Sequence, residues 1–233
     1  MNLALDLCVS ITRIIPMQEK TALKWKLSQW LEYKWWKSYL KHKDVEQYLN
    51  SKCNYWNKIL DTISPYLPLL KDQKILDAGC GPAGIFMVAQ GNEVVALDPL
   101  LDKYKTLAHF KPSLFPWTKF KKGNIEAKEE INHYDVIFCM NAINHVNDIH
   151  LCYQKLAQVL KPGGHLIIST DAHRHKFLKK IFQFIPGDAL HPIQLDITEY
   201  LNLLNIHEFN ITKNVLYKEG NIFHYYITIA TKN

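Results

Sequence analysis

The chain has 233 residues, of which 48% are apolar and 21% charged, and it carries a formal net charge of +6. This length suffices for one sizeable α/β domain plus an extension, and the composition excludes a disordered chain. No apolar run reaches the roughly 18 residues needed to span a bilayer. The five cysteines fit no metal-binding spacing, so reduced thiols in a cytoplasmic protein are expected.

A helical extension is predicted over residues 1–65, ahead of a Rossmann-like domain over residues 66–233. A short amphipathic helix is expected over Met1–Ile15, which lacks the basic start of a signal peptide. Two longer helices are predicted over Glu19–Leu40 and Asp44–Ile63, and together they hold five of the six tryptophans.

The predicted helix over Glu19–Leu40 carries two apolar stripes, which cannot both face the same core. One stripe is expected to pack on the domain, and the other to face a pocket, a partner or a lipid surface. The lysines between the aromatic residues are interpreted as a solvated helical face rather than a nucleic-acid site. They also fit a peripheral contact with an anionic membrane surface.

A glycine-rich turn follows a short buried strand at Ile75 and Leu76. Gly79, Gly81 and Gly84 form a G-x-G-x-x-G pattern, which allows a tight turn and lets a ligand lie against bare backbone. A helix is expected over residues 84–90, with its N-terminus directed at that ligand.

A second apolar strand over Glu93–Asp98 ends in a carboxylate. Asp98 lies 19 residues after Gly79, near the spacing of about 20 that is typical of a ribose-binding acid. The two strand ends therefore predict a site for an adenosine-containing cofactor. These residues alone leave two classes open, a dinucleotide and S-adenosylmethionine.

Strands and helices alternate through the rest of the chain, which implies a mostly parallel sheet with helices on both faces. A turn signal at Lys218–Asn221 predicts a C-terminal antiparallel hairpin. The fold class is therefore α/β, with a Rossmann-like sheet of seven strands. The expected elements are helix Leu100–Leu107, strands Thr118–Lys122 and Tyr134–Met140, helix Ile149–Leu160, strand His165–Thr170, an inserted helix His173–Phe184, helix Ile197–Leu204 and hairpin strands Phe209–Leu216 and Ile222–Thr231.

Three motifs resemble those of the class I S-adenosylmethionine-dependent methyltransferases. They are the glycine motif Leu76–Gly81, the strand Tyr134–Asn141 and the turn and strand Leu160–Ser169, in the family's order. The resemblance implies S-adenosyl-L-methionine as the cofactor and excludes NAD. It also implies N-terminal helices that cap the substrate pocket, so that loss of residues 1–40 should abolish methyl transfer and spare cofactor affinity.

The resemblance also assigns the parts of the cofactor to residues. The Gly79 backbone would hold the methionyl ammonium, Asp98 the ribose hydroxyls, and Asn124 and Ile125 the adenine. Asn124 stands where the family usually has an acid, and its amide oxygen can still accept a hydrogen bond. The predicted cofactor-binding residues are Asp77, Gly79, Cys80, Gly81, Gly84, Asp98, Pro99, Asn124, Ile125, Met140 and Asn141.

Three histidines are candidates for a catalytic base, which is needed only if the acceptor must lose a proton. His145 follows the fourth predicted strand, where the family's histidine is often structural. His173 follows the fifth strand, and His191 lies in the insertion that forms the family's substrate lid. Asp171 beside this histidine pair has no regular metal-ligand spacing, so no metal is expected.

The leading interpretation is methyl transfer to a small, apolar or aromatic acceptor. Methylation of an RNA or a protein is the first alternative, although no Asn/Asp-Pro-Pro-Tyr/Phe motif follows the strand that ends at Met140. A cofactor-binding protein without catalysis is the second alternative. The quinone-pathway O-methyltransferases share the first motif and a His-Val pair, but Asn141 and Asn144 replace their acidic residues.

Overall fold

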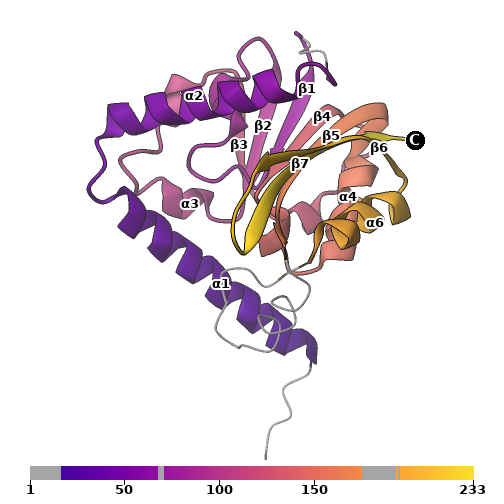
Figure 1. Cartoon of the computed structure of the whole chain (residues 1–233). Helices are drawn as coiled ribbons and strands as arrows, with labels where there is room; N and C mark the ends of the chain where they lie inside the picture. The colour runs from indigo at the N-terminus through magenta and orange to yellow at the C-terminus, as the bar shows by residue number, and fades with distance from the viewer. Residues whose placement is uncertain (1–16, 68–70, 175–192, 194) are drawn as a thin grey trace, which may run out of the picture.

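The computed structural model describes residues 17–67, 71–174, 193 and 195–233, with side chains described from Trp25 onward. Its centre is a sheet of seven strands in the order β3-β2-β1-β4-β5-β7-β6 (Figure 1). The five strands from β1 to β5 are parallel, and β7 runs antiparallel to both β5 and β6. The predicted fold class is therefore confirmed. The strands are β1 (Lys74–Ala78), β2 (Glu93–Asp98), β3 (Thr118–Lys122), β4 (Tyr134–Met140), β5 (Leu160–His173), β6 (Phe209–Lys218) and β7 (Phe223–Lys232).

Helices cover both faces of the sheet, as the alternation of elements predicts. Along β4, Val136, Phe138 and Met140 belong to the core beneath α2, whereas Ile137 and Cys139 belong to the core beneath α4 and α6. The two cores follow from the period of two in a strand whose faces are both buried. The helices are α1 (Met17–Leu40), α2 (Val45–Ile63), α3 (Leu101–Tyr104), α4 (Ile149–Val159) and α6 (Ile197–Ile206).

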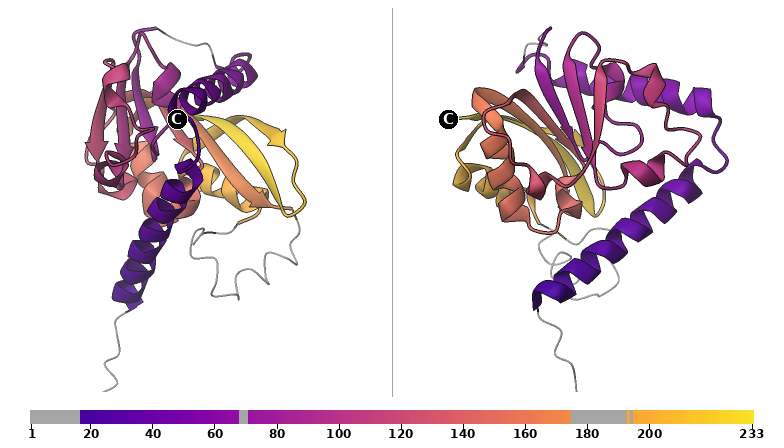
Figure 2. Two further views of the ribbon diagram at one scale, coloured as in Figure 1. Left: turned by 90° about the vertical axis from the view of Figure 1, so that its left-hand side faces the viewer. Right: turned by 180° about the vertical axis from the view of Figure 1, so that it is seen from behind.

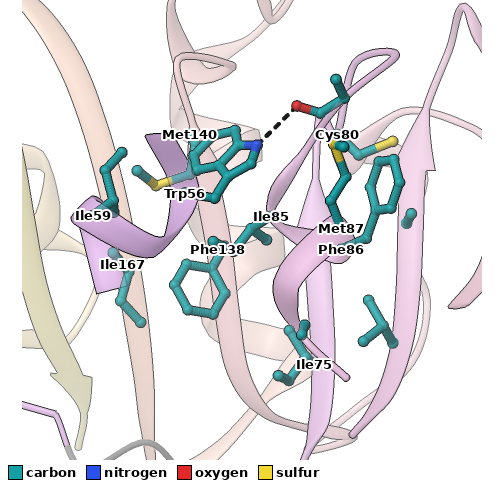
Figure 3. Close-up of a cluster of buried hydrophobic side chains, with 14 of the residues drawn as sticks. Trp56, Ile59, Ile75, Cys80, Ile85, Phe86, Met87, Phe138, Met140 and Ile167 are labelled. Carbon is teal, nitrogen blue, oxygen red and sulfur yellow. Dashed lines mark hydrogen bonds between the residues drawn. The ribbon is translucent and has the colours of Figure 1, made fainter. Parts of the chain in front are cut away.

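Helix α2 is part of the main core. Asp44 caps its N-terminus by accepting a 2.9 Å hydrogen bond from the backbone N–H of Gln47. Trp56, Ile59 and Ile63 on its inner face are buried. Figure 3 shows the Trp56 ring beside Met140, with its indole nitrogen bonded to a backbone carbonyl of the loop after β1.

Helix α1 crosses the end of the sheet, and its first turns extend past the body of the molecule (Figures 1 and 2). Long-range hydrogen bonds attach it to the domain, including one from the Tyr104 hydroxyl to Glu32. Trp25 Nε1 donates to the His145 carbonyl oxygen at 3.1 Å, and the Tyr33 and Thr106 hydroxyls lie 2.9 Å apart. Among the described residues, no helix is long and apolar enough to cross a bilayer.

Some expected elements differ from the structure. The helix expected over residues 84–90 is a single 3-10 turn, η1 (Ile85–Val88), whose Phe86 N–H donates to the Asp77 carboxylate. The expected helix Leu100–Leu107 shortens to α3, and β5 extends to His173. Of the expected inserted helix, residues 175–184 lie outside the described residues, as does Met1–Ile15.

Candidate active site

Two adjoining cavities open at the carboxyl ends of β1, β2 and β4. The smaller has a volume of about 60 Å³ and the larger about 410 Å³. Glu32, Gly79, Asn141 and His145 line both cavities. Ligands of open α/β sheets bind at this edge, and the larger volume lies within the range of about 300–1,000 Å³ that small-molecule sites occupy.

The loop after β1 contributes lining residues to both cavities. Its backbone N–H groups at Gly79 and Cys80 donate to the Leu97 carbonyl oxygen at 2.8 and 3.1 Å, which ties the loop to β2. Gly79 has a φ of +73°, a conformation that L side chains rarely adopt, and a Cβ atom there would collide with that of Ala142. Only glycine therefore fits this position, and the bare backbone remains open to a ligand.

The Asp98 carboxylate anchors the same loop from the end of β2. Its Oδ2 atom accepts a 2.9 Å hydrogen bond from Gly81 N–H, and its Oδ1 atom accepts a 2.7 Å bond from Leu100 N–H. Asp98 is buried and lines the smaller cavity. Burial and the charge of Glu32 raise the pKa of Asp98 above its usual range.

Asp77 is fully enclosed beneath the loop, outside the lining of both cavities. Its Oδ2 atom accepts a 3.1 Å hydrogen bond from Phe86 N–H and so holds the turn η1 in place. Burial raises the pKa of Asp77 to about 7. The Asp77 carboxylate therefore occupies the N-terminus of η1. The sequence predicts that this N-terminus is directed at the ligand, and the structure shows that it is directed at Asp77 instead.

The structure brings most of the predicted cofactor residues to one place. The smaller cavity is lined by Gly79, Asp98, Pro99, Asn124 and Asn141. Ile125 lines the smaller cavity as well, and Cys80, Gly81 and Met140 line the larger one. Gly84 lines neither, because its backbone packs directly against the Asp77 carboxylate where a Cβ atom would have no space.

The three candidate histidines occupy different surroundings. His145 lies in the turn η4 (Ile143–His145) and lines both cavities. His173 is buried at the end of β5 with its ring centroid 4.5 Å from that of Phe223, and it lines neither cavity. His191 lies outside the described residues. The described residues contain no cluster of three or more His, Cys, Asp or Glu side chains that could hold a metal ion.

A family model described as a methyltransferase domain matches residues 47–209, which include the strand ends that form both cavities. The chain belongs to the class I S-adenosylmethionine-dependent methyltransferases. The motifs from Leu76 to Ser169 all lie inside the matched region, so the resemblance stated from the sequence is confirmed.

Curated relatives of this methyltransferase are ubiquinone biosynthesis O-methyltransferases. The protein of Rickettsia bellii is 30% identical over 144 residues, which span 60% of this chain and 58% of that protein. The mitochondrial protein of Mus musculus is 29% identical over 153 residues, which span 61% of this chain and 41% of that protein. The chain thus matches roughly three fifths or less of these relatives' length.

Solved structures of other methyltransferases share the fold. Magnesium protoporphyrin IX methyltransferase from Synechocystis, with bound S-adenosylhomocysteine, superposes with a TM-score of 0.65 at 15% identity. That match covers 91% of this chain and 99% of the other. A Burkholderia thailandensis 1,6-didemethyltoxoflavin-N1-methyltransferase gives 0.59 at 15% identity, covering 99% and 93%.

Helix α1 lines the site of this methyltransferase, as the sequence predicts for the N-terminal helices, but sequence reasoning missed the polar residues Gln29 and Glu32. Trp25, Gln29 and Glu32 line the smaller cavity, and Glu32 and Trp36 line the larger one. The spacing of these four residues, four then three then four, places them on one helical face. The stripes predicted from the sequence are made of apolar residues only. Because Gln29 and Glu32 at the centre of this face are polar, that pattern does not identify the face as one that lines a site.

Proposed function

We propose that the chain transfers the methyl group of S-adenosyl-L-methionine to a small aromatic acceptor. The observation that carries this proposal is the larger cavity, which combines the loop after β1 with a set of aromatic side chains. Those side chains are Trp35, Trp36, Tyr55, Trp56 and Tyr225. Family membership supplies the reaction class.

The residues of the smaller cavity fit the cofactor. Asp98 is a buried carboxylate that still has acceptor lone pairs for ribose hydroxyls, and Asn124 and Ile125 lie beside it for the adenine. The conformation of Gly79 leaves backbone exposed for the methionyl part. Structures of the two methyltransferases described above hold S-adenosylhomocysteine, which supports the same cofactor here.

The larger cavity favours a flat, mostly apolar acceptor with a polar substituent. Rings from α1, α2 and β7 enclose it, and aromatic surfaces bury large apolar area at specific geometry. Lys52 and Asn141 add polar groups to the lining. Similarity to O-methyltransferases of ubiquinone biosynthesis supports an oxygen as the acceptor atom, which on the aromatic acceptor proposed here would be a phenolic hydroxyl.

Methyl transfer depends mainly on the alignment of the acceptor with the methyl group, and less on catalytic side chains of the protein. Bound S-adenosylmethionine supplies an electrophilic methyl group on a sulfonium, and the protein positions the acceptor in line with it. Deprotonation of a phenol needs a base, and His145 is the described histidine that lines both cavities. We assign it this role, with the neutral imidazole taking the acceptor proton.

The decisive experiment uses radiolabelled S-adenosylmethionine and a cell extract divided into small-molecule and macromolecular fractions. Label that enters the small-molecule fraction, and stays absent with Asp98→Ala, supports the proposal. Label in the RNA or protein fraction supports the macromolecular alternative. Cofactor binding without label transfer to either fraction supports a non-catalytic binding protein and contradicts the proposed reaction.

We also propose that the protein works in the cytoplasm at an anionic membrane surface. Leu27, Trp30, Lys34 and Lys37 recur every three or four residues on the face of α1 opposite the cavities, Lys41 follows directly after the helix, and all are exposed. Sedimentation with phosphatidylcholine vesicles should require added phosphatidylglycerol. Equal binding to vesicles with and without phosphatidylglycerol would contradict this contact. Unchanged binding of the double variant that combines Lys34→Glu and Lys37→Glu would contradict it as well.

A further inference from the structure

Helix α1 contributes hydrogen-bond acceptors to the smaller cavity. Gln29 and Glu32 line it together with Asp98, which lies at the end of β2. None of these three groups forms an ion pair with a lysine, an arginine or a histidine in the part of the chain that the structure describes. Hydrogen-bond acceptors that line a cavity favour a ligand that carries hydrogen-bond donors and positive charge.

Gln29 has an unused acceptor atom. Its side chain is only 7% exposed, and its Nε2 atom donates to Glu32 Oε2 at 3.4 Å. Its Oε1 atom is buried and has no hydrogen-bond partner in the described structure. Buried polar atoms in native proteins almost always have a partner, so this oxygen indicates a donor that the ligand brings.

Glu32 is held in place at the boundary between the two cavities. The Tyr104 hydroxyl donates to its Oε1 atom at 3.3 Å, and both Tyr104 and the Trp36 side chain from the next turn act to lower the pKa of this carboxylate against the effect of burial. The groups that face it are therefore Tyr104 from α3, Asp98 from β2, and Gln29 and Trp36 from α1 itself. Burial raises the pKa of Glu32, and its charge raises that of Asp98, so each carboxylate disfavours ionisation of the other.

We propose that Gln29 and Glu32 bind the cofactor, and that Glu32 distinguishes S-adenosylmethionine from S-adenosylhomocysteine by charge. This inference rests on the proposed function. The cofactor brings ribose hydroxyls and an ammonium group as donors, and the sulfonium adds a positive charge that the product lacks. A cationic ligand relieves the repulsion between Glu32 and Asp98, and a neutral sulfur relieves it less.

The consequence is a helix that holds the substrate form of the cofactor more tightly than the product form. Because α1 also encloses the acceptor cavity through Trp35 and Trp36, loss of the sulfonium charge weakens the closure of both cavities after methyl transfer. This arrangement changes the expectation for a protein that lacks residues 1–40. Such a protein should lose cofactor affinity as well as methyl transfer.

The test is isothermal titration of S-adenosylmethionine and S-adenosylhomocysteine into the full chain and its variants. Glu32→Gln should weaken binding of S-adenosylmethionine by about 10-fold or more and binding of the product by less than about 3-fold. Gln29→Leu should weaken both by about 10-fold. Glu46→Gln removes an exposed carboxylate on α2 and is the matched control, which should leave both affinities unchanged.

Trypsin cleavage of α1 provides a second readout that does not depend on activity. Lys26, Lys34 and Lys37 are exposed on this helix. The substrate cofactor should protect them more than the product does in the wild type, and Glu32→Gln should abolish that difference. Thermal unfolding of each variant identifies any that fail to fold. If Glu32→Gln does not fold, Gln29→Leu tests the binding role of α1, and equal protection of wild-type α1 by the two ligands overturns the discrimination by charge.

The outcomes separate the two proposals. A wild-type protein that binds neither ligand contradicts the proposed function itself. A wild-type protein that binds both, with Glu32→Gln and Gln29→Leu equal to Glu46→Gln, overturns the role of α1 and leaves the proposed function standing. Equal losses of both ligands in Glu32→Gln overturn the discrimination by charge.

Discussion

The indole nitrogen of Trp56 donates a 2.9 Å hydrogen bond to the carbonyl oxygen of Ala83. This bond, dashed in Figure 3, joins a helix of the core to the loop after β1, which carries Gly79 and Gly81. Trp56 is 7% exposed, and its ring lies within the core beneath α2. The position of the loop therefore depends on α2 as well as on β1 and β2.

Trp56→Phe should keep much of the ring packing and lose this bond. We expect the free energy of unfolding to fall by about 1–3 kcal/mol, because a buried carbonyl loses its donor. Urea denaturation measures the change, and Trp30→Phe is the control because Trp30 is 48% exposed. Equal effects of the two substitutions would show that the bond to Ala83 contributes nothing.

Gly79→Ala should abolish cofactor binding or folding of the loop. The residue combines a φ of +73° with a collision between the new methyl group and Ala142. Gly163→Ala is a matched control, since Gly163 has a φ of +72° and open space around its Cα atom. Backbone strain alone should cost the control about 1 kcal/mol and leave its cofactor affinity unchanged. Calorimetric titration with S-adenosylhomocysteine compares the two, and similar losses of affinity would refute a specific role for Gly79.

Asp77 should make the stability of the cofactor-free protein fall as the pH rises. The folded protein keeps its proton up to a pKa of about 7, whereas the unfolded chain loses it near pH 4. The contribution is fully present below pH 4 and is lost as the pH rises to about 7, at up to about 1.4 kcal/mol per pH unit. Denaturation of wild type and Asp77→Asn across this range gives the difference. An identical slope in both proteins would contradict the assignment, and Asp61→Asn, on the exposed side of α2, controls for charge.

Asp98→Ala should weaken cofactor binding by a few kcal/mol, on the order of one or two charge-assisted hydrogen bonds. It removes the acceptor for ribose hydroxyls and also the anchor of Gly81 N–H. Asp98→Asn keeps one acceptor oxygen and should lose less. Titration with S-adenosylhomocysteine, and with NAD as a ligand that should not bind, checks both points. Unchanged affinity in a folded Asp98→Ala protein, or binding of NAD, would contradict the assignment of the site.

Several strands can be predicted to the residue from their patterns. The expected bounds of Glu93–Asp98, Thr118–Lys122 and Tyr134–Met140 are those that the structure has. Two of them are short apolar runs that end in polar or glycine-rich turns, a pattern typical of strands buried on both faces. Because the carboxyl ends of parallel strands meet at one edge, the sequence alone places Asp98 and Asn141 in one site.

The rest of the site depends on contacts that lie far apart in sequence. Gln29 and Glu32 are polar residues in a long helix, where the ordinary expectation is exposure to solvent. Only the approach of α1 to Tyr104 and Asp98 shows that they face a cavity. Similarly, the turn η1 replaces an expected helix because the Asp77 carboxylate holds Phe86 N–H, a bond that no local propensity encodes.

Strand β7 lies between β5 and β6, although it follows both in the chain. It pairs with β5 along the whole length from His165 to His173, and it contributes Tyr225 to the larger cavity. During synthesis, β5 therefore emerges from the ribosome as an open sheet edge that no later strand can protect until β7 has been made. Exposed edges of this kind recruit other chains. Nascent chains stalled before Phe223 should accordingly aggregate or occupy chaperones, and they should lack the side of the acceptor cavity that Tyr225 forms even though the loop carrying Gly79 is already complete.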